Sequence, residues 1–149
     1  MNGVSAENRV TRRHALRTAA LVLVAACAPG GPEAILYGVD GCAFCKMQIA
    51  EPRFAAELVT AHGKSVKFDS IECLLGYVHS SIRGDLKSVW VSDFRNPGTM
   101  LDAAQVRFID LGPGRAPMGR GWAAVATARD AAALGVIDAG AIKRWTELL

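Results

Sequence analysis

Short stretches of apolar residues interrupted by polar ones, each bounded by turn-forming residues, recur along the chain from residue 53 onward and indicate β-strands. The stretches 53–60 and 65–68 enclose Ala61-His-Gly-Lys64, where Gly63 suits the positive φ of a tight turn. They therefore predict a β-hairpin. Further strands are predicted over 87–92, 106–110 and 122–127.

A second pattern, with apolar residues at positions i, i+3, i+4 and i+7, predicts an amphipathic helix from Ile71 to about Ser80. Either Asp69 or Ser70 supplies its N-cap, because both side chains accept hydrogen bonds from the first helical N–H groups. A shorter helix is expected over 127–134, and a last helix is expected to close the chain over 141–149.

The order of these elements predicts the fold class. A hairpin, a helix and a strand are followed by a strand, a Gly/Pro-rich loop, a strand and a helix, and then by the terminal helix. This order favours an α+β fold with antiparallel β-sheet, two related halves and a C-terminal helix. Residues 34–149 form the domain, and 28–33, rich in Pro and Gly, form a flexible tether before it.

The charge distribution changes the first impression of a basic protein. The chain has 149 residues and a formal net charge of +3, which invites a nucleic-acid partner. Residues 1–27 carry four arginines and one glutamate, which account for the whole excess, and residues 28–149 hold 13 basic and 13 acidic side chains. No nucleic-acid partner is therefore expected.

Residues 1–27 have the organisation of an export signal. The arginines precede an uncharged run, 18–26, that is much shorter than the ~20 residues of a membrane span. Val24-Ala-Ala-Cys27 is similar to a bacterial lipobox, so Cys27 is expected to carry the lipid. Since Ala28 follows in place of Asp, we expect a lipid anchor on the periplasmic side, at the outer membrane.

The remaining cysteines are Cys42, Cys45 and Cys73, and Met47 lies two residues after Cys45. Thiolate and thioether sulfur select Cu(I), which favours a soft-metal site. Three other interpretations stay open. A zinc site needs a fourth ligand from His62 or His79. The other two are a thiol-disulfide redox protein that uses Cys42 and Cys45, and a structural disulfide such as Cys45–Cys73.

Met118 strengthens the soft-metal interpretation. It lies between Pro117 and Gly119 in a loop too rich in Gly and Pro to form a helix or strand, so it has no periodic face on which to pack. Met100 is less constrained and is assigned to packing. No Ser-His-Asp set, HExxH motif or phosphate-binding Gly loop is present, so the sequence predicts neither an enzyme nor a small-molecule substrate.

Three segments resemble one known family. They are Cys42-Ala-Phe-Cys-Lys-Met-Gln-Ile49, Lys67-Phe-Asp-Ser-Ile-Glu-Cys73 and Ala116-Pro-Met-Gly-Arg-Gly-Trp122. In this order they resemble the nitrous oxide reductase accessory proteins of the NosL family, over residues from about 35 to 135. The family fold of two small ββαβ-like halves agrees with the element order above.

The resemblance implies a Cu(I)-binding metallochaperone with no catalytic residues. Cys45 and Met47 match the family's C-x-M pair, Met118 matches its P-M-G methionine, and Cys42 and Cys73 are further candidate ligands. It also implies delivery of copper to nitrous oxide reductase or another extracytoplasmic cuproenzyme, together with an ABC-type membrane complex in denitrification. The alternative function is thiol-disulfide exchange at Cys42 and Cys45.

Overall fold

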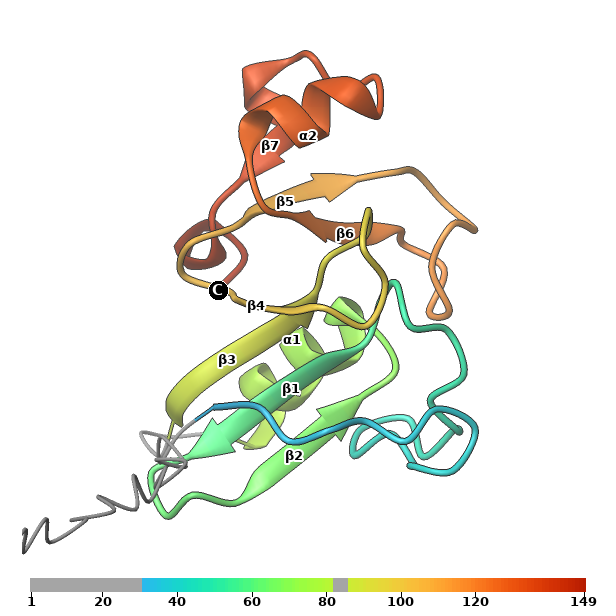
Figure 1. Ribbon diagram of the computed structural model, residues 1–149, viewed down its shortest axis with the longest axis vertical. Helices are drawn as coiled ribbons and strands as arrows, with labels where there is room; N and C mark the ends of the chain where they lie inside the picture. The colour runs from blue at the N-terminus through green and yellow to red at the C-terminus, as the bar shows by residue number, and fades with distance from the viewer. Residues whose placement is uncertain (1–30, 82–85) are drawn as a thin grey trace, which may run out of the picture.

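The computed structural model describes residues 31–81 and 86–149. The predicted export signal, the predicted lipidation site Cys27 and residues 28–30 of the predicted tether lie outside this part of the chain. Within it, no helix has both the length and the apolar character needed to cross a membrane. Two small α+β halves are stacked along the long axis of the molecule (Figure 1).

The first half consists of β1 (Ala56–Thr60), β2 (Ser65–Phe68), α1 (Ile71–Ser81), β3 (Leu86–Ser92) and β4 (Met100–Asp102). Its four strands form an antiparallel sheet in the order β2-β1-β3-β4. The β1–β2 hairpin confirms the sequence prediction, and its turn contains Gly63 with a φ of 79°. Helix α1 packs on β1 and β2 (Figure 1).

The second half repeats this arrangement with β5 (Arg107–Asp110), β6 (Trp122–Val125), α2 (Ala128–Ala133) and β7 (Ile142–Lys143). Its antiparallel strands lie in the order β6-β5-β7, so the first strand of the half is again central. Thr127 caps α2 and exchanges hydrogen bonds with Asp130 in a capping box. The predicted α+β fold with two ββαβ halves is therefore confirmed.

The second sheet is buried on both faces, which is what joins the two halves. Phe108 and Ala124 pack into the main core, which the first sheet and α1 share. Neighbouring residues along the same strands point the other way, and Ile109 and Val125 pack with Ala131 of α2. This division follows from the alternation of side chains along a strand.

The C-terminal segment differs from the helix predicted over Ala141–Leu149. It forms β7 between two short 3₁₀ turns, Ala139–Ala141 and Trp145–Glu147. Ile142 pairs with Ile109 and supplies the third strand of the second sheet. A nine-residue helix is marginal by itself, so strand pairing and burial of Trp145 decide the conformation of this segment.

Candidate metal centre

A tight turn in the loop before β1 brings the thiols of Cys42 and Cys45 to the same side of that loop. The Cys42 N–H donates to the Met47 carbonyl at 2.7 Å, and the Lys46 N–H donates to the Cys42 carbonyl at 3.1 Å. Lys46 has a φ of 67°, the left-handed conformation that closes the turn. A bridge between Gly41 and Gln48 closes its base. The loop 41–48 is thus fixed largely by its own backbone.

Contacts with β2 and α1 hold this loop in place. The Ala43 N–H donates to the Lys67 carbonyl at 2.9 Å, and the Lys67 ammonium forms a 2.8 Å ion pair with Asp40. The Phe44 ring lies directly on α1 at Gly76, where a Cβ atom would lie 2.6 Å from the ring. Glycine at this position therefore allows the loop to approach the helix one turn after Cys73.

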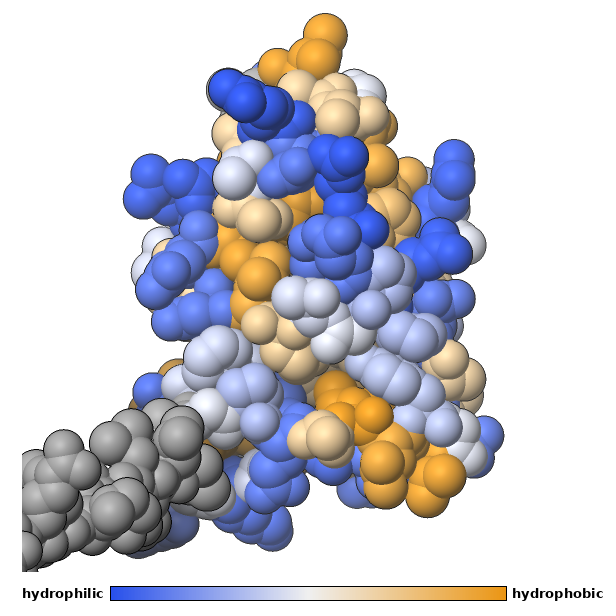
Figure 2. All heavy atoms as spheres, in the orientation of Figure 1, coloured by the Kyte–Doolittle hydropathy of each residue, from blue (hydrophilic) through white to orange (hydrophobic). Residues whose placement is uncertain are grey.

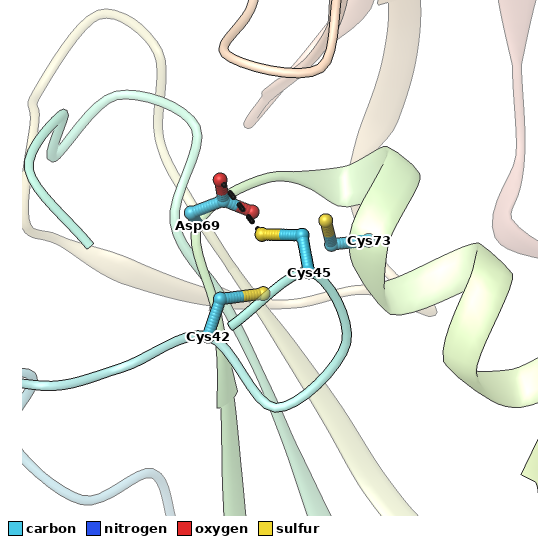
Figure 3. A group of neighbouring side chains, drawn as sticks. All are labelled: Cys42, Cys45, Asp69 and Cys73. Atoms are coloured by element: carbon cyan, nitrogen blue, oxygen red, sulfur yellow. Dashed lines mark hydrogen bonds between the residues drawn. The ribbon is translucent and has the colours of Figure 1, made fainter. Parts of the chain in front are cut away.

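Two neighbouring residues at the start of α1, Ser70 and Asp69, have different roles. Ser70 is the cap: its hydroxyl accepts the Cys73 N–H at 3.2 Å, and its carbonyl accepts the Leu74 N–H at 3.1 Å. The adjacent Asp69 is therefore free of capping and faces the thiols (Figure 3). Cys73 lies in the first turn of the helix, on the same side.

These segments create a cluster of three sulfur atoms and a carboxylate. The ligand atoms of Cys42, Cys45, Asp69 and Cys73 all lie within 4.8 Å of one another (Figure 3). Cys42 is 2% exposed, Asp69 2% and Cys73 0%, and Cys45 is half-buried. The three cysteines are free thiols. Such a set of S and O donors is suited to holding a metal ion.

Burial disfavours the thiolate forms of Cys45 and Cys73. Burial raises the pKa of the Cys45 thiol, although a hydrogen bond from the Met47 backbone N–H partly offsets the effect. Burial, reinforced by the neighbouring Asp69, raises the pKa of the Cys73 thiol far above its ordinary range. A nucleophilic redox thiol needs a lowered pKa. The raised pKa values therefore favour a metal site, at which the cation displaces protons, over thiol-disulfide exchange.

Met47 lies in the same loop but points to the surface. Its side chain is 48% exposed, and the large apolar residues Val39 and Phe44 of the adjoining segment are exposed too. Figure 2 shows hydrophobic surface at the lower right, over the loop that Figure 1 draws in cyan. A thioether is therefore accessible from outside within two residues of the buried cluster.

Met118 lies on the loop between β5 and β6 and is 39% exposed. The base of this loop is narrow, because a Cβ atom at Gly121 would lie 2.2 Å from the Gly112 carbonyl oxygen. One Glu72 carboxylate oxygen accepts the N–H groups of Gly121 and Trp122 at 2.8 and 3.0 Å. Hydrogen bonds to a charged group contribute about 1.5–3 kcal/mol each, so Glu72 ties the loop firmly to α1 beside Cys73.

The structure thus brings together Cys42, Cys45 and Cys73, three of the five candidate ligands. That Met47 and Met118 complete one ligand set with them stays a prediction. His62 and His79 are exposed, and neither belongs to the cluster, so neither is the fourth ligand of a zinc site.

Asp69 is the residue that sequence reasoning missed, because it was assigned to the helix N-terminus. Its Oδ2 accepts a hydrogen bond from the Cys45 thiol at 3.5 Å. A signal was present in the sequence: Asp69 and Ser70 are both able to cap α1, whereas one cap is sufficient.

Comparisons with known proteins identify the family of this chain and a solved structure with a similar fold. The NosL family profile matches residues 35–149. Among curated proteins, no match to this chain is found. One similar solved structure is the crystal structure of the copper chaperone NosL from Shewanella denitrificans, with 22% identity and a TM-score of 0.63. The alignment covers 78% of this chain and 96% of that one, and at this identity it shows a shared fold. Since the family profile spans most of the sequence, the chain belongs to the NosL family.

Proposed function

We propose that this protein is a copper chaperone that carries Cu(I) as cargo and is not an enzyme. The observation that carries the proposal is the convergence of three free thiols within 4.8 Å, in a member of the NosL family. Thiolate and thioether sulfur are the donors that Cu(I) prefers. The solved relative that shares this fold is itself described as a copper chaperone.

Cys45, Met47 and Met118 are the proposed ligands from which copper is handed over, with Cys42 and Cys73 as further thiol donors. A donor that exchanges a metal with a partner must be within reach of the partner's own ligands. Cys45 is half-buried and the two thioethers are exposed, whereas Cys42 and Cys73 are buried. Copper therefore leaves by way of Cys45 and the methionines, as the partner's donors replace them one at a time.

Nitrous oxide reductase is the proposed recipient of the copper, with an ABC-type membrane complex assisting. A copper titration under anaerobic conditions, followed by mixing with the copper-free reductase, tests this. We expect the purified protein to bind Cu(I) and to restore copper to the enzyme, measured as metal content and N₂O reduction. Met118→Ala should weaken Cu(I) binding by at least about tenfold.

Met100→Ala is the matched control for Met118→Ala, because Met100 lies in β4, outside the proposed ligand set. It should bind and transfer copper like the wild type. The proposal is contradicted if the wild type takes up no Cu(I), or if Met118→Ala and Met100→Ala behave alike. Uptake without transfer to the reductase would indicate another recipient.

The proposed location is the periplasmic face of a membrane, at the outer membrane, through a lipid on Cys27. The support is the lipobox-like sequence Val24-Ala-Ala-Cys27 after an uncharged run. We expect Cys27→Ser to move the protein from the membrane fraction to the soluble or unprocessed fraction of the cells. Membrane association that is equal for Cys27→Ser and the wild type would exclude this anchor.

A further inference from the structure

The outer edge of β2 borders an open cleft. Among the described strands, β2 pairs with β1 alone, so it is an edge strand of the first sheet (Figure 1). Residues 64–67 form one wall of the cleft, and parts of the loop 40–46 and Tyr77 of α1 form the others. Its volume of about 410 Å³ lies within the ~300–1,000 Å³ that is usual for ligand sites.

The register of the β1–β2 hairpin leaves backbone groups of this edge unpaired. The Thr60 N–H donates to the Lys64 carbonyl at 2.9 Å, and bonded and non-bonded positions alternate from there along the ladder. The N–H and C=O groups of Ser65 and Lys67 therefore point away from β1. The Lys67 carbonyl accepts the Ala43 N–H at 2.9 Å, and the other three groups have no hydrogen-bond partner within the described part of the chain. The edge thus offers two donors and one acceptor to another strand.

The cleft is also positively charged. Three lysines, Lys46, Lys64 and Lys67, line it together with a single carboxylate, that of Asp40. Lys67 forms its 2.8 Å ion pair with Asp40, so no carboxylate of the lining balances the other two lysines. Lys46 and Lys64 are both exposed. An anionic ligand is therefore favoured over a cationic one.

The two faces of the sheet differ beside this edge. Because side chains alternate along a strand, Ser65 and Lys67 lie on one face, and Val66 lies on the opposite face, in the main core. Tyr77 of α1 packs against this core, with its ring 5.2 Å from that of Phe68. A strand added at the edge therefore meets charged groups with every second side chain and an apolar, aromatic surface with the others.

We propose that the outer edge of β2 binds an extended, acidic segment of a partner protein, which adds to the first sheet as a further strand. The backbone groups of Ser65 and Lys67 provide the pairing, and acidic side chains at alternate positions of the segment meet the lysines. Strand addition of this kind combines main-chain hydrogen bonds, which give affinity, with side-chain contacts, which give specificity.

Charge disfavours the two other occupants of such an edge. A second copy of this chain paired through its own β2 would bring a second set of the same lysines into the cleft. The segment 1–27 of this chain carries four arginines and one glutamate, so it has the wrong sign for the lysines. A different protein with an acidic segment is the occupant that fits.

The bound segment ends against the loop that presents Met47. Ala43 of this loop already bonds to the end of β2, so a partner held on the remaining edge lies beside the loop 41–48. In copper transfer, this would place the partner next to the exposed thioether. Only that consequence rests on the proposed function, because pairing with β2 requires no metal.

A titration of the reduced, metal-free protein followed by ¹⁵N NMR tests the proposal. The probe is a short peptide of alternating glutamate and valine, blocked at both ends. We expect saturable shifts of the Ser65 and Lys67 amide signals, and weaker binding at high salt. The same peptide methylated at every backbone nitrogen keeps its charges but has no N–H to donate. A peptide with lysine in place of glutamate keeps its N–H groups but has the wrong charge. Both should bind at least about tenfold more weakly.

Two variants of the protein separate the backbone from the charge contribution. Ser65→Pro removes an N–H that points away from β1, so the hairpin ladder is retained. Lys64→Glu reverses a charge of the cleft. Each should weaken binding of the acidic peptide by at least about fivefold. Arg129→Glu reverses an exposed charge on α2 and is the matched control, which should bind the peptide like the wild type. All three variants should keep the Cu(I) affinity of the wild type, so this proposal and the copper proposal fail separately.

Three results would overturn the proposal. The first is a wild-type protein whose Ser65 and Lys67 signals do not shift at millimolar acidic peptide, since the lysines would then serve only to keep the edge from pairing. The second is equal binding of the methylated peptide. The third is wild-type binding by Lys64→Glu, with folding checked by circular dichroism, which keeps the test decisive even if Ser65→Pro does not fold.

Discussion

Replacing Cys45 and Met47 together by alanine is expected to lower the affinity for Cu(I) by at least about 100-fold, or about 2.7 kcal/mol. The substitutions remove the most accessible thiol of the cluster and the thioether that lies two residues farther along the same loop. Met47 is exposed, and Cys45 is half-buried and packs only against the edge of the main core, so that core should remain intact.

An anaerobic competition titration against a Cu(I) chelator of known affinity measures this effect. Met100→Ala provides the comparison, since it removes a methionine from β4 and leaves the loop 41–48 unchanged. The proposed role of Cys45 and Met47 as copper ligands is contradicted if the double variant binds Cu(I) with wild-type affinity. A loss in both single variants that exceeds the loss in Met100→Ala would show that the thiol and the thioether act on the same ion.

Trp145→Ala is expected to lower the free energy of unfolding by about 3–5 kcal/mol. Trp145 is 9% exposed and packs in the main core, with its ring 5.9 Å from that of Phe108. Removing it leaves a cavity where the C-terminal segment meets the second sheet. Urea denaturation followed by circular dichroism gives the value.

Ile137→Ala is the control for this prediction, because it shortens an apolar side chain that is 84% exposed. Its free energy of unfolding should differ from that of the wild type by less than about 0.5 kcal/mol. Equal effects of Trp145→Ala and Ile137→Ala would mean that the C-terminal segment is not docked on the core. In that case β7 would also be lost as an edge strand of the second sheet.

Most elements of the first half follow from the sequence, although the short edge strand β4 was not predicted. The hairpin of β1 and β2 and the helix α1 lie where turn chemistry and apolar periodicity place them. These signals are local, because a turn residue or a helical face acts on neighbours a few positions away. The helix predicted over Ala141–Leu149 was wrong, because the pairing of Ile142 with Ile109 is a long-range contact that no local pattern indicates.

The candidate site, like the fold, was predictable from the sequence only in its local features. The spacing of Cys42 and Cys45 fits a metal-binding turn, and the structure closes that turn largely with backbone hydrogen bonds. The role of Asp69 could be identified only from the structure. There Ser70 caps α1, and Asp69 accepts a hydrogen bond from the Cys45 thiol. The tie between Glu72 and the Met118 loop spans 49 residues and was equally hidden.

By itself, the amino-acid sequence determined the kinds of donor and most of the elements that carry them. The chemistry of a sulfur donor depends only on the residue type, and the periodicity of a strand or helix depends only on residues close by in the sequence. The tertiary structure decided which donors meet. It buried Cys42, Cys73 and Asp69, left Met47 and Met118 at the surface, and placed the short strand β7 in the C-terminal segment. Those outcomes depend on contacts between distant segments, whose free energy is gained only when both halves are packed together.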